Sequence, residues 1–283
     1  MAGRIGEGSI AVFNLAYNLQ SIPLSVVGVS FSLAAFPAIA VSVARKNSVE
    51  VAKRISEGIR QIILWSLPIV ALLIILRAHV VRVILGGGNF DWADTRLTAA
   101  ALALFAVSTI FQSIQLFLSR SHYALGETKR PLIGNIVGGG LSVFFAIILL
   151  NFAMADGIFS PIASFLNIED LPHAILALPL AFSLGSILSA LLLFVFLGRN
   201  LVQQIAREIR TVIWQAALAA VLAALASYGV LRLTDGIFDL DTFLGVLGHG
   251  FLAGLAGLVV ATYFLHRLGN REFRNMLRRF KDS

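Results

Sequence analysis

The chain has 283 residues, of which 58% are hydrophobic and only 13% are charged, about half the charged share of a soluble domain. Its mean hydropathy of +0.88 excludes a water-soluble globular enzyme, and the absence of cysteine excludes disulfide scaffolds, thiolate metal sites and cysteine nucleophiles. The net charge of +7 does not indicate a nucleic-acid partner, because the basic residues lie between long uncharged runs. The sequence therefore predicts an all-α, polytopic membrane protein.

Uncharged runs of the length that spans a bilayer predict seven transmembrane helices. The first run could form about 55 Å of helix, and we expect one helix that bends near Pro23. The second run is short and is extended by Arg60 and Arg77, whose long side chains reach the interfaces. The runs are 8–44, 61–76, 97–119, 131–155, 174–198, 211–231 and 242–265.

Basic and acidic connections alternate along the chain. Lysine and arginine concentrate at 45–57, 120–130, 199–210 and after 266, whereas acidic residues occur at 156–170 and 235–241. The positive-inside rule then places the C-terminus in the cytoplasm and, with seven spans, the N-terminus outside. Since no signal peptide precedes the first span, we expect a fragment or one half of a split protein.

Three segments outside the spans have patterns of their own. Residues 79–91 predict a short amphipathic helix on the membrane surface that ends at Gly86, after which Asp91 or Asp94 caps the third span. A second surface helix is expected within 154–173. The tail mixes apolar residues with arginine, which fits either a helix on anionic lipid or a solvated basic segment.

Polar residues inside the spans are the candidates for function, because they are costly in hydrocarbon. Two stripes at helical spacing occur, Asn14, Asn18, Ser21 and Ser25 in the first run and Ser108, Gln112, Gln115 and Ser119 in the third. The stripes either line one hydrated cavity for a polar headgroup or hold packed helices together. Arg60 lies near one mouth, where it either contacts a phosphate or only reaches the interface.

Two pairs of glycines lie four positions apart, on one face of a helix, and this pattern predicts close helix packing. The pairs are Gly134 with Gly138 and Gly250 with Gly254. No catalytic triad, metal cluster or carboxylate pair lies within a span of the sequence. We therefore predict that the protein is not an enzyme, and the sequence implies no cofactor.

Two stretches have a more specific pattern. The first covers 8–37 and has a proline at 23 followed by a Gly-Val pair at 28 and 29. The second covers 84–131 and ends, from Arg120, in Arg-Ser-His-Tyr-Ala-Leu-Gly-Glu-Thr-Lys-Arg-Pro. These stretches resemble the eighth helix and the end of the tenth helix of the MurJ/MviN family of lipid II flippases, with Glu127 in place of an aspartate. The residues matching the second motif are Arg120, Tyr123, Gly126, Thr128 and Pro131.

The resemblance implies helices eight to fourteen of a flippase that moves an undecaprenyl-pyrophosphate-linked peptidoglycan precursor across the bacterial cytoplasmic membrane by alternating access. It implies a five-span lobe over 1–198, two further helices over 199–266 in contact with the lipid tail, and a basic cytoplasmic tail over 267–283. Membrane lipids and a missing or separate N-terminal lobe would be its partners. The expected cavity residues are Asn14, Asn18, Ser21, Gln112 and Gln115, with Arg60 at the cytoplasmic mouth.

One position departs from the family pattern. The eighth helix of the family typically carries a cavity arginine, and the aligned position here is Asn18, which gives phosphate no charge-assisted contact. The sequence therefore predicts a lipid II flippase, with a non-transporting scaffold for cell-wall synthesis or a flippase for another lipid-linked oligosaccharide as the alternatives. An enzyme acting on lipid phosphates is disfavoured, because the acidic residues available to it, Glu50, Glu57 and Glu127, show no paired arrangement.

Overall fold

The computed structural model describes residues 8–87, 90–154, 173–270 and 272–274, with single positions at 161, 164, 166 and 168. The regular elements in these residues are helices, and seven helices are long and apolar enough to cross a membrane, which confirms the predicted class and number of spans. The elements are α1 (Ser9–Pro23), η2 (Leu24–Val29), α2 (Ser30–Ala44), α3 (Ser48–Ile75), α4 (Arg77–Leu85), α5 (Trp92–Ala124), α6 (Lys129–Met154), η3 (His173–Leu176), α8 (Ala177–Phe196), α9 (Arg199–Leu233) and α10 (Phe243–Arg267).

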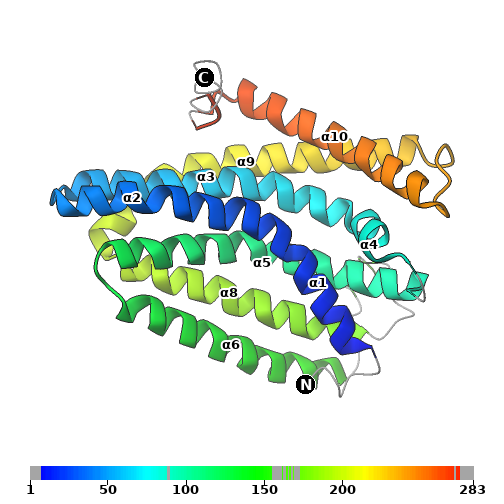
Figure 1. Ribbon diagram of the computed structural model, residues 1–283, viewed down its shortest axis with the longest axis horizontal. Helices are drawn as coiled ribbons and strands as arrows, with labels where there is room; N and C mark the ends of the chain where they lie inside the picture. Colours follow the sequence, from blue (N-terminus) through cyan, green and yellow to red (C-terminus); the bar gives the residue numbers. More distant parts are fainter. Residues whose placement is uncertain are drawn as a thin grey trace.

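The helices pack in the order α6, α8, α5, α3, α9 and α10, and the first span lies across the middle of this row (Figure 1). α1 packs on α5, and α2 packs on both α3 and α5. The α2–α3, α5–α6 and α8–α9 connections lie together at one end of the bundle. We call it the basic end, because Arg45, Lys46, Lys129, Arg130 and Arg199 flank these connections.

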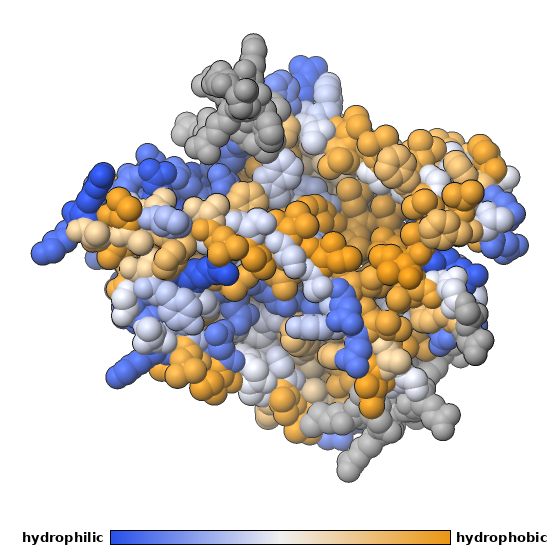
Figure 2. All heavy atoms as spheres, viewed as in Figure 1, coloured by the Kyte–Doolittle hydropathy of each residue, from blue (hydrophilic) through white to orange (hydrophobic). Residues whose placement is uncertain are grey.

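The outer surface is largely apolar. Figure 2 shows hydrophobic side chains over much of α10, and hydrophilic side chains at the two ends of the bundle and in the middle of this face. Exposed apolar residues on the outer helices include Trp214, Leu225, Leu244, Phe251 and Val259. An apolar surface of this extent is incompatible with water and suits hydrocarbon. The chain is a multi-pass membrane protein.

α5 is the central helix of the bundle. Its Phe117 and Leu118 belong to a buried cluster near the basic end, and its Leu102 and Phe105 belong to a second cluster in the opposite half. α3 contributes to the first cluster through residues such as Ile59. Because apolar side chains of α5 are buried along its whole length, the rotation of this helix about its axis is fixed by packing.

The first span is one continuous helix that bends at Pro23, as predicted. Proline has no N–H to donate to the preceding turn, and the helix opens there into a π-helical segment over Leu24–Val29. Gly28 lies in this segment, and a Cβ on it would come within 3.0 Å of Ser113 Cα. The absence of a side chain at this position therefore lets the first span approach α5 closely.

Two helices, α3 and α9, begin far earlier than the uncharged runs predict. α3 starts at Ser48 and α9 starts at Arg199, so the connections expected at 45–57 and 199–210 are largely helical. In the extension of α9, Ile205 and Ile209 are buried while Arg199 is exposed. An amphipathic helix continues past the hydrocarbon edge as long as one face is buried, here against α3. Charged residues therefore mark the membrane edge rather than the end of the helix.

The predicted short helix before Gly86 and the cap of the third span are both confirmed. Asp91 Oδ1 accepts a hydrogen bond from Asp94 N at 2.8 Å, and Asp94 Oδ2 accepts from Asp91 N at 3.3 Å, which completes a capping box. The helix expected within 154–173 lies mostly outside the described residues. Of the apolar side chains within it, Leu166 and Ile168 are described, and both are buried in the core.

The close packing predicted around Gly134 and Gly138 is also confirmed, and the partner helix is α8. A Cβ on Gly134 would lie 2.6 Å from Leu193 Cδ2, and a Cβ on Gly138 would lie 2.5 Å from Ser189 Cβ. On the facing helix, a Cβ on Gly185 would lie 2.7 Å from the carbonyl oxygen of Gly138. The two backbones are therefore close enough for Ser189 Oγ to donate to Gly134 O at 2.9 Å.

We expect Gly185→Ala to destabilise the protein by about 1–3 kcal/mol, because the new methyl group meets a backbone oxygen that cannot move without shifting α6. Gly139→Ala is the matched control, since a Cβ there meets open space and alanine favours the helix by about 1 kcal/mol. Thermal unfolding in detergent should separate the two variants. Equal unfolding temperatures would contradict the close approach of α6 and α8.

At the end opposite the basic end, α10 contacts α4 through two histidines. His79 Nε2 lies 3.2 Å from His249 Nδ1, and His249 Nε2 lies 3.2 Å from Leu231 O. Gly250 permits this approach, because a Cβ on it would lie only 3.0 Å from His79 Cβ. Burial, and then the neighbouring His249, lowers the pKa of His79 from 6.5 to about 4. A neutral imidazole therefore holds α4 against α10.

This pKa predicts a pH-dependent stability. Above pH 6.5, His79 is neutral in both the folded and the unfolded chain. As the pH falls from 6.5 toward 4, the unfolded chain takes up a proton that the folded chain refuses, so the free energy of unfolding decreases. We expect the unfolding temperature to fall between pH 7 and pH 5, and His79→Gln to flatten that slope. An unchanged slope in the variant would show that other groups carry the pH dependence.

Candidate functional site

A polar hollow of about 580 Å³ opens between α5 and α6 and extends toward the basic end. It brings together Gln112 and Gln115, which the sequence predicted as cavity residues, with Arg120 and Tyr123 of the predicted motif. Gln115 Nε2 donates to Asn135 Oδ1 of α6 at 2.8 Å, which joins the two helices across the hollow. Its lining residues are Leu24, Gln112, Gln115, Leu116, Ser119, Arg120, Tyr123 and Asn135.

The lining residues of α5 share one face because they recur every three or four positions, from Gln112 through Ser119 to Tyr123. Phe117 and Leu118 point to other sides of the same helix and are buried in the core. Core packing therefore holds the polar face of α5 toward the hollow.

Arg120 makes the hollow electropositive. Within the part of the chain that the structure describes, its guanidinium forms no ion pair and no hydrogen bond. The other polar groups of the hollow are amides and hydroxyls, which are neutral donors and acceptors. A guanidinium surrounded by such groups is suited to binding a phosphate or pyrophosphate through charge-assisted hydrogen bonds. The arrangement can therefore recognise an anionic headgroup.

The first span contacts α5 through Gln20, which the stripe pattern missed. Gln20 Oε1 lies 3.3 Å from Ser108 Oγ, 3.1 Å from Thr109 Oγ1 and 3.0 Å from Gln112 Nε2, and it accepts hydrogen bonds from all three. Gln20 is 1% exposed and Ser108 is fully buried. Ser108 therefore helps to hold two packed helices together, whereas Gln115 lines the hollow, and the use of that hollow as a headgroup cavity stays a prediction.

The predicted stripe of the first span lies on a different face of α1. Asn14 and Asn18 are exposed, and the half-buried Ser21 donates its hydroxyl proton to Asn18 O at 2.6 Å. None of the three belongs to the lining of the hollow, because α1 is rotated so that Gln20 faces α5. Their assignment to a substrate cavity stays a prediction.

The motif at 120–131 forms the turn between α5 and α6. Gly126 has a φ of 80°, a left-handed conformation that favours glycine, and its N–H donates to Tyr123 O at 3.0 Å. The N–H of Glu127 donates to His122 O at 2.9 Å, which completes a Schellman motif. The glycine of the motif is therefore required to end α5.

The remaining motif residues start the next helix. Thr128 lies immediately before α6, and its carbonyl oxygen accepts from Leu132 N at 3.4 Å. Pro131 falls in the first turn of α6, where a backbone N–H has no partner within the helix and its loss costs nothing. Of the five motif residues, three therefore build the turn, and Arg120 and Tyr123 face the hollow.

A buried histidine fixes this turn to α8. His122 is fully buried, with Nδ1 3.0 Å from Glu127 Oε2 and Nε2 3.0 Å from Leu193 O. Arg130 contacts the same Glu127 oxygen at 2.7 Å and donates to Phe196 O at 2.5 Å. Glu127, which stands where the resemblance expected an aspartate, thus reaches two basic groups at once. The family motif has no fixed residue at the position of His122, so no sequence pattern singled this histidine out.

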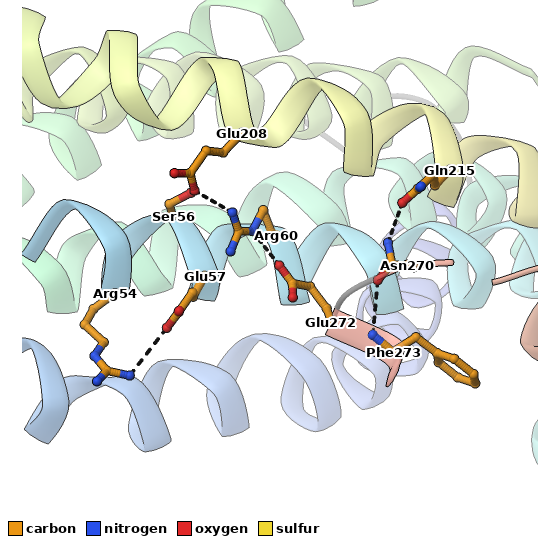
Figure 3. Close-up of polar contacts among 9 residues, drawn as sticks. All are labelled: Arg54, Ser56, Glu57, Arg60, Glu208, Gln215, Asn270, Glu272 and Phe273. Atoms are coloured by element: carbon orange, nitrogen blue, oxygen red, sulfur yellow. Dashed lines mark hydrogen bonds and ion pairs between the residues drawn. The ribbon is translucent and has the colours of Figure 1, made fainter. Parts of the chain in front are cut away.

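Arg60 lies apart from the hollow. Figure 3 shows its side chain on α3, directed toward Glu208 of α9 and Glu272 beyond α10. Its Nε lies 2.6 Å from Glu272 Oε1, its terminal nitrogen contacts Glu208, and Ser56 Oγ donates to the same Glu208 carboxylate. Two carboxylates therefore compensate the Arg60 charge. The structure does not bring Arg60 together with Gln112 and Gln115.

The segment that follows α10 packs back onto the bundle. Asn270 Nδ2 donates to Gln215 Oε1 of α9 at 2.6 Å (Figure 3). Phe273 is 5% exposed, and its ring centroid lies 6.2 Å from that of Trp65 on α3. The described start of the tail thus packs on α9 and α3, and the two interpretations of the basic tail stay predictions. Most basic residues of the tail lie outside the described residues.

The family of the chain follows from its sequence as a whole. The sequence profile described as lipid II flippase MurJ matches residues 1–247. The chain belongs to this family. Its assignment to the MurJ family confirms the resemblance that the motifs at 8–37 and 84–131 indicated.

Two curated relatives illustrate the extent of the match. The probable lipid II flippase MurJ of Rickettsia prowazekii is 34% identical over 127 residues, which are 44% of this chain and 25% of the relative. That of Borreliella burgdorferi is 22% identical over 152 residues, 54% of this chain and 30% of the relative. The match thus covers about half of this MurJ-family chain and under a third of each relative.

A solved structure named lipid II flippase MurJ, inward closed conformation, has the same fold. It aligns with a TM-score of 0.66 and 21% identity, over 93% of this chain and 48% of that chain. This MurJ-family chain therefore spans about half the length of the structure that it matches.

Because this MurJ-family chain contains no cysteine, single cysteines report accessibility without a background signal. We expect Gln115→Cys and Tyr123→Cys to react with a small water-soluble thiol reagent, since both line the hollow. Ser108→Cys is the control and should stay protected, because Ser108 is fully buried. Labelling rates in membrane vesicles measure the difference. Protection of all three positions would show that water does not enter the hollow.

Proposed function

We propose that this chain is the C-terminal half of a flippase that moves lipid II, a lipid-linked peptidoglycan precursor, across the bacterial cytoplasmic membrane by alternating access. Membership of the MurJ family and the multi-pass helical fold support this assignment. The single observation that carries it is Arg120, which no carboxylate among the described residues compensates, in a polar hollow between two membrane helices. The proposal involves binding and movement, with no bond made or broken.

In the proposed mechanism, Arg120 receives the pyrophosphate of the headgroup. Moving an unpaired charge into a region of low dielectric is very costly, so a carrier must supply compensating cations and hydrogen-bond donors. Arg120 supplies one cation, and Gln112, Gln115 and Asn135 supply amide donors. A pyrophosphate carries about two or more negative charges, so we assign the remaining cations to an N-terminal lobe that faces this one.

The contacts around the α5–α6 turn support a rigid-body movement. His122, Glu127 and Arg130 join α5, α6 and α8 through contacts at the basic end, so these three helices would rock as one unit against a second lobe. The exposed apolar faces of α9 and α10 would meanwhile contact the lipid tail in the bilayer.

The test is binding of a pyrophosphate-linked polyprenyl lipid to the purified chain. We expect Arg120→Gln to weaken binding about ten- to a hundredfold, because a charge-assisted hydrogen bond contributes about 1.5–3 kcal/mol. Arg120→Lys keeps the charge but loses the planar set of N–H donors, so its affinity should lie between those of Arg120→Gln and the parent chain. A competition assay with the unlabelled lipid measures all three proteins.

Arg60→Gln is the control, because Arg60 is paired with Glu208 and Glu272 away from the hollow. It should lower the unfolding temperature while leaving the affinity for the lipid within about twofold of the parent chain. If Arg120→Gln binds the lipid as tightly as the parent, the hollow is not a headgroup site. If the parent chain binds the lipid through Arg120, co-expression with an N-terminal lobe tests transport. Binding without translocation would favour the scaffold function.

A further inference from the structure

α8 and α9 diverge from a tight turn at the basic end (Figure 1). Gly198 forms this turn with a φ of 91°. From there, α8 packs on α5 and α6, whereas α9 packs on α3 and α10. The diverging helices leave a groove of about 570 Å³ between them, and side chains of α3 and α5 form its floor. The groove thus results from the different partners of two consecutive helices.

The groove is apolar along its floor and walls. Ile63 of α3 and Phe111 of α5 lie at the floor, Leu191 lies on the α8 side, and Ile213 and Trp214 lie on the α9 side. Trp214 is 71% exposed, so the groove is open on its outer side. Since water does not occupy an apolar space of this kind, a groove that opens toward hydrocarbon takes up a hydrocarbon chain.

One charged residue, Arg210, lines this groove. It is exposed, and among the described residues it has no ion-pair partner. It is the last charged residue before the uncharged run 211–231, and Trp214 follows one helical turn later. Arginine and tryptophan at this spacing mark the level of lipid headgroups. The cation is therefore at the headgroup level, directly beside a groove for an acyl chain.

We infer that this groove binds an anionic glycerophospholipid, with its phosphate at Arg210 and one acyl chain between α8 and α9. The charge of Arg210 favours an anionic headgroup, and the apolar lining of the groove favours an acyl chain. A phospholipid with a negative charge has both parts in one molecule. The site is distinct from the hollow around Arg120, because Phe111 and Ile114 of α5 face the groove whereas Gln112 and Gln115 face the hollow. A lipid seated here fills the space between α8 and α9 and connects the α9–α10 pair to the rest of the bundle.

The groove contains its own reporter, since Trp214 is one of only three tryptophans. A variant with Trp65→Phe and Trp92→Phe leaves Trp214 as the sole fluorophore. The chain is reconstituted into vesicles of phosphatidylcholine and phosphatidylglycerol, with either lipid dibrominated to quench the tryptophan. We expect phosphatidylglycerol to be preferred about fivefold at Trp214, which corresponds to about 1 kcal/mol.

Arg210→Gln should reduce this preference to about one, whereas the matched Arg207→Gln, on the same helix but outside the groove lining, should leave it unchanged. Ala206→Phe keeps the charge and fills the groove from its exposed α9 side, so it should also lower the preference. Unfolding temperatures of the variants show that each is folded. Equal quenching by both lipids in the parent, or loss of the preference in Arg207→Gln alone, would overturn the inference.

A further measurement distinguishes a phospholipid of the bilayer from a polyprenyl lipid that the protein would transport. Adding polyprenyl pyrophosphate at low mole fraction should leave the quenching by brominated phosphatidylglycerol unchanged. Displacement at that concentration would assign the groove to the polyprenyl lipid and overturn the inference. Because these measurements report lipid preference and need no translocation, their outcome is independent of the proposed flippase function.

Discussion

An arginine side chain at the edge of the hydrocarbon has to be matched by an anion, by backbone oxygens or by water, since an unmatched buried charge is very costly. Much of this bundle is organised by how each guanidinium meets that requirement. Arg60 is matched by two carboxylates, one from α9 and one from the segment after α10, so it joins three parts of the chain. Arg130 is matched by Glu127 and by a backbone oxygen of α8.

Arg120 and Arg210 differ from these two because no described carboxylate compensates them. Each lies beside a space rather than inside a packed contact, the polar hollow for Arg120 and the apolar groove for Arg210. The same residue type thus has a structural role where the chain supplies the anion, and we propose a recognition role where no described group supplies it. The surroundings of each arginine decide which role it has.

The sequence was sufficient for the features that depend on local chemistry. Hydropathy is enough to count the spans, Pro23 is enough to place the bend, and Asp91 is enough to start α5, because each depends on residues a few positions apart. That Gln112 and Gln115 share one face of α5 was predictable for the same reason, since their spacing alone indicates it, and both line the hollow.

The partners of these residues were not predictable in that way. Spacing shows that Asn14 and Asn18 share a face, but the rotation of α1 against α5 depends on packing between segments far apart in the chain, and it turns Gln20 inward instead. Arg60 was placed by its depth near one mouth of the bundle. Its neighbours in the structure, Glu208 and Glu272, lie more than a hundred residues away in the sequence, and no local pattern predicts them.

The π-helical segment after Pro23 has a consequence for insertions and deletions in this chain. A π turn holds one residue more than an α turn, so the length of Leu24–Val29 sets the angular offset between the faces of α1 and α2. Gain or loss of one residue there would rotate all of α2 by about 100° relative to α1. Ile39 would then leave the core, although its own helix would be intact. A change of length in the turn before Asn47 would not rotate the next helix in this way, because a loop can adjust its conformation. A change of length within the first span is therefore harder to accommodate than one in the turn that follows it.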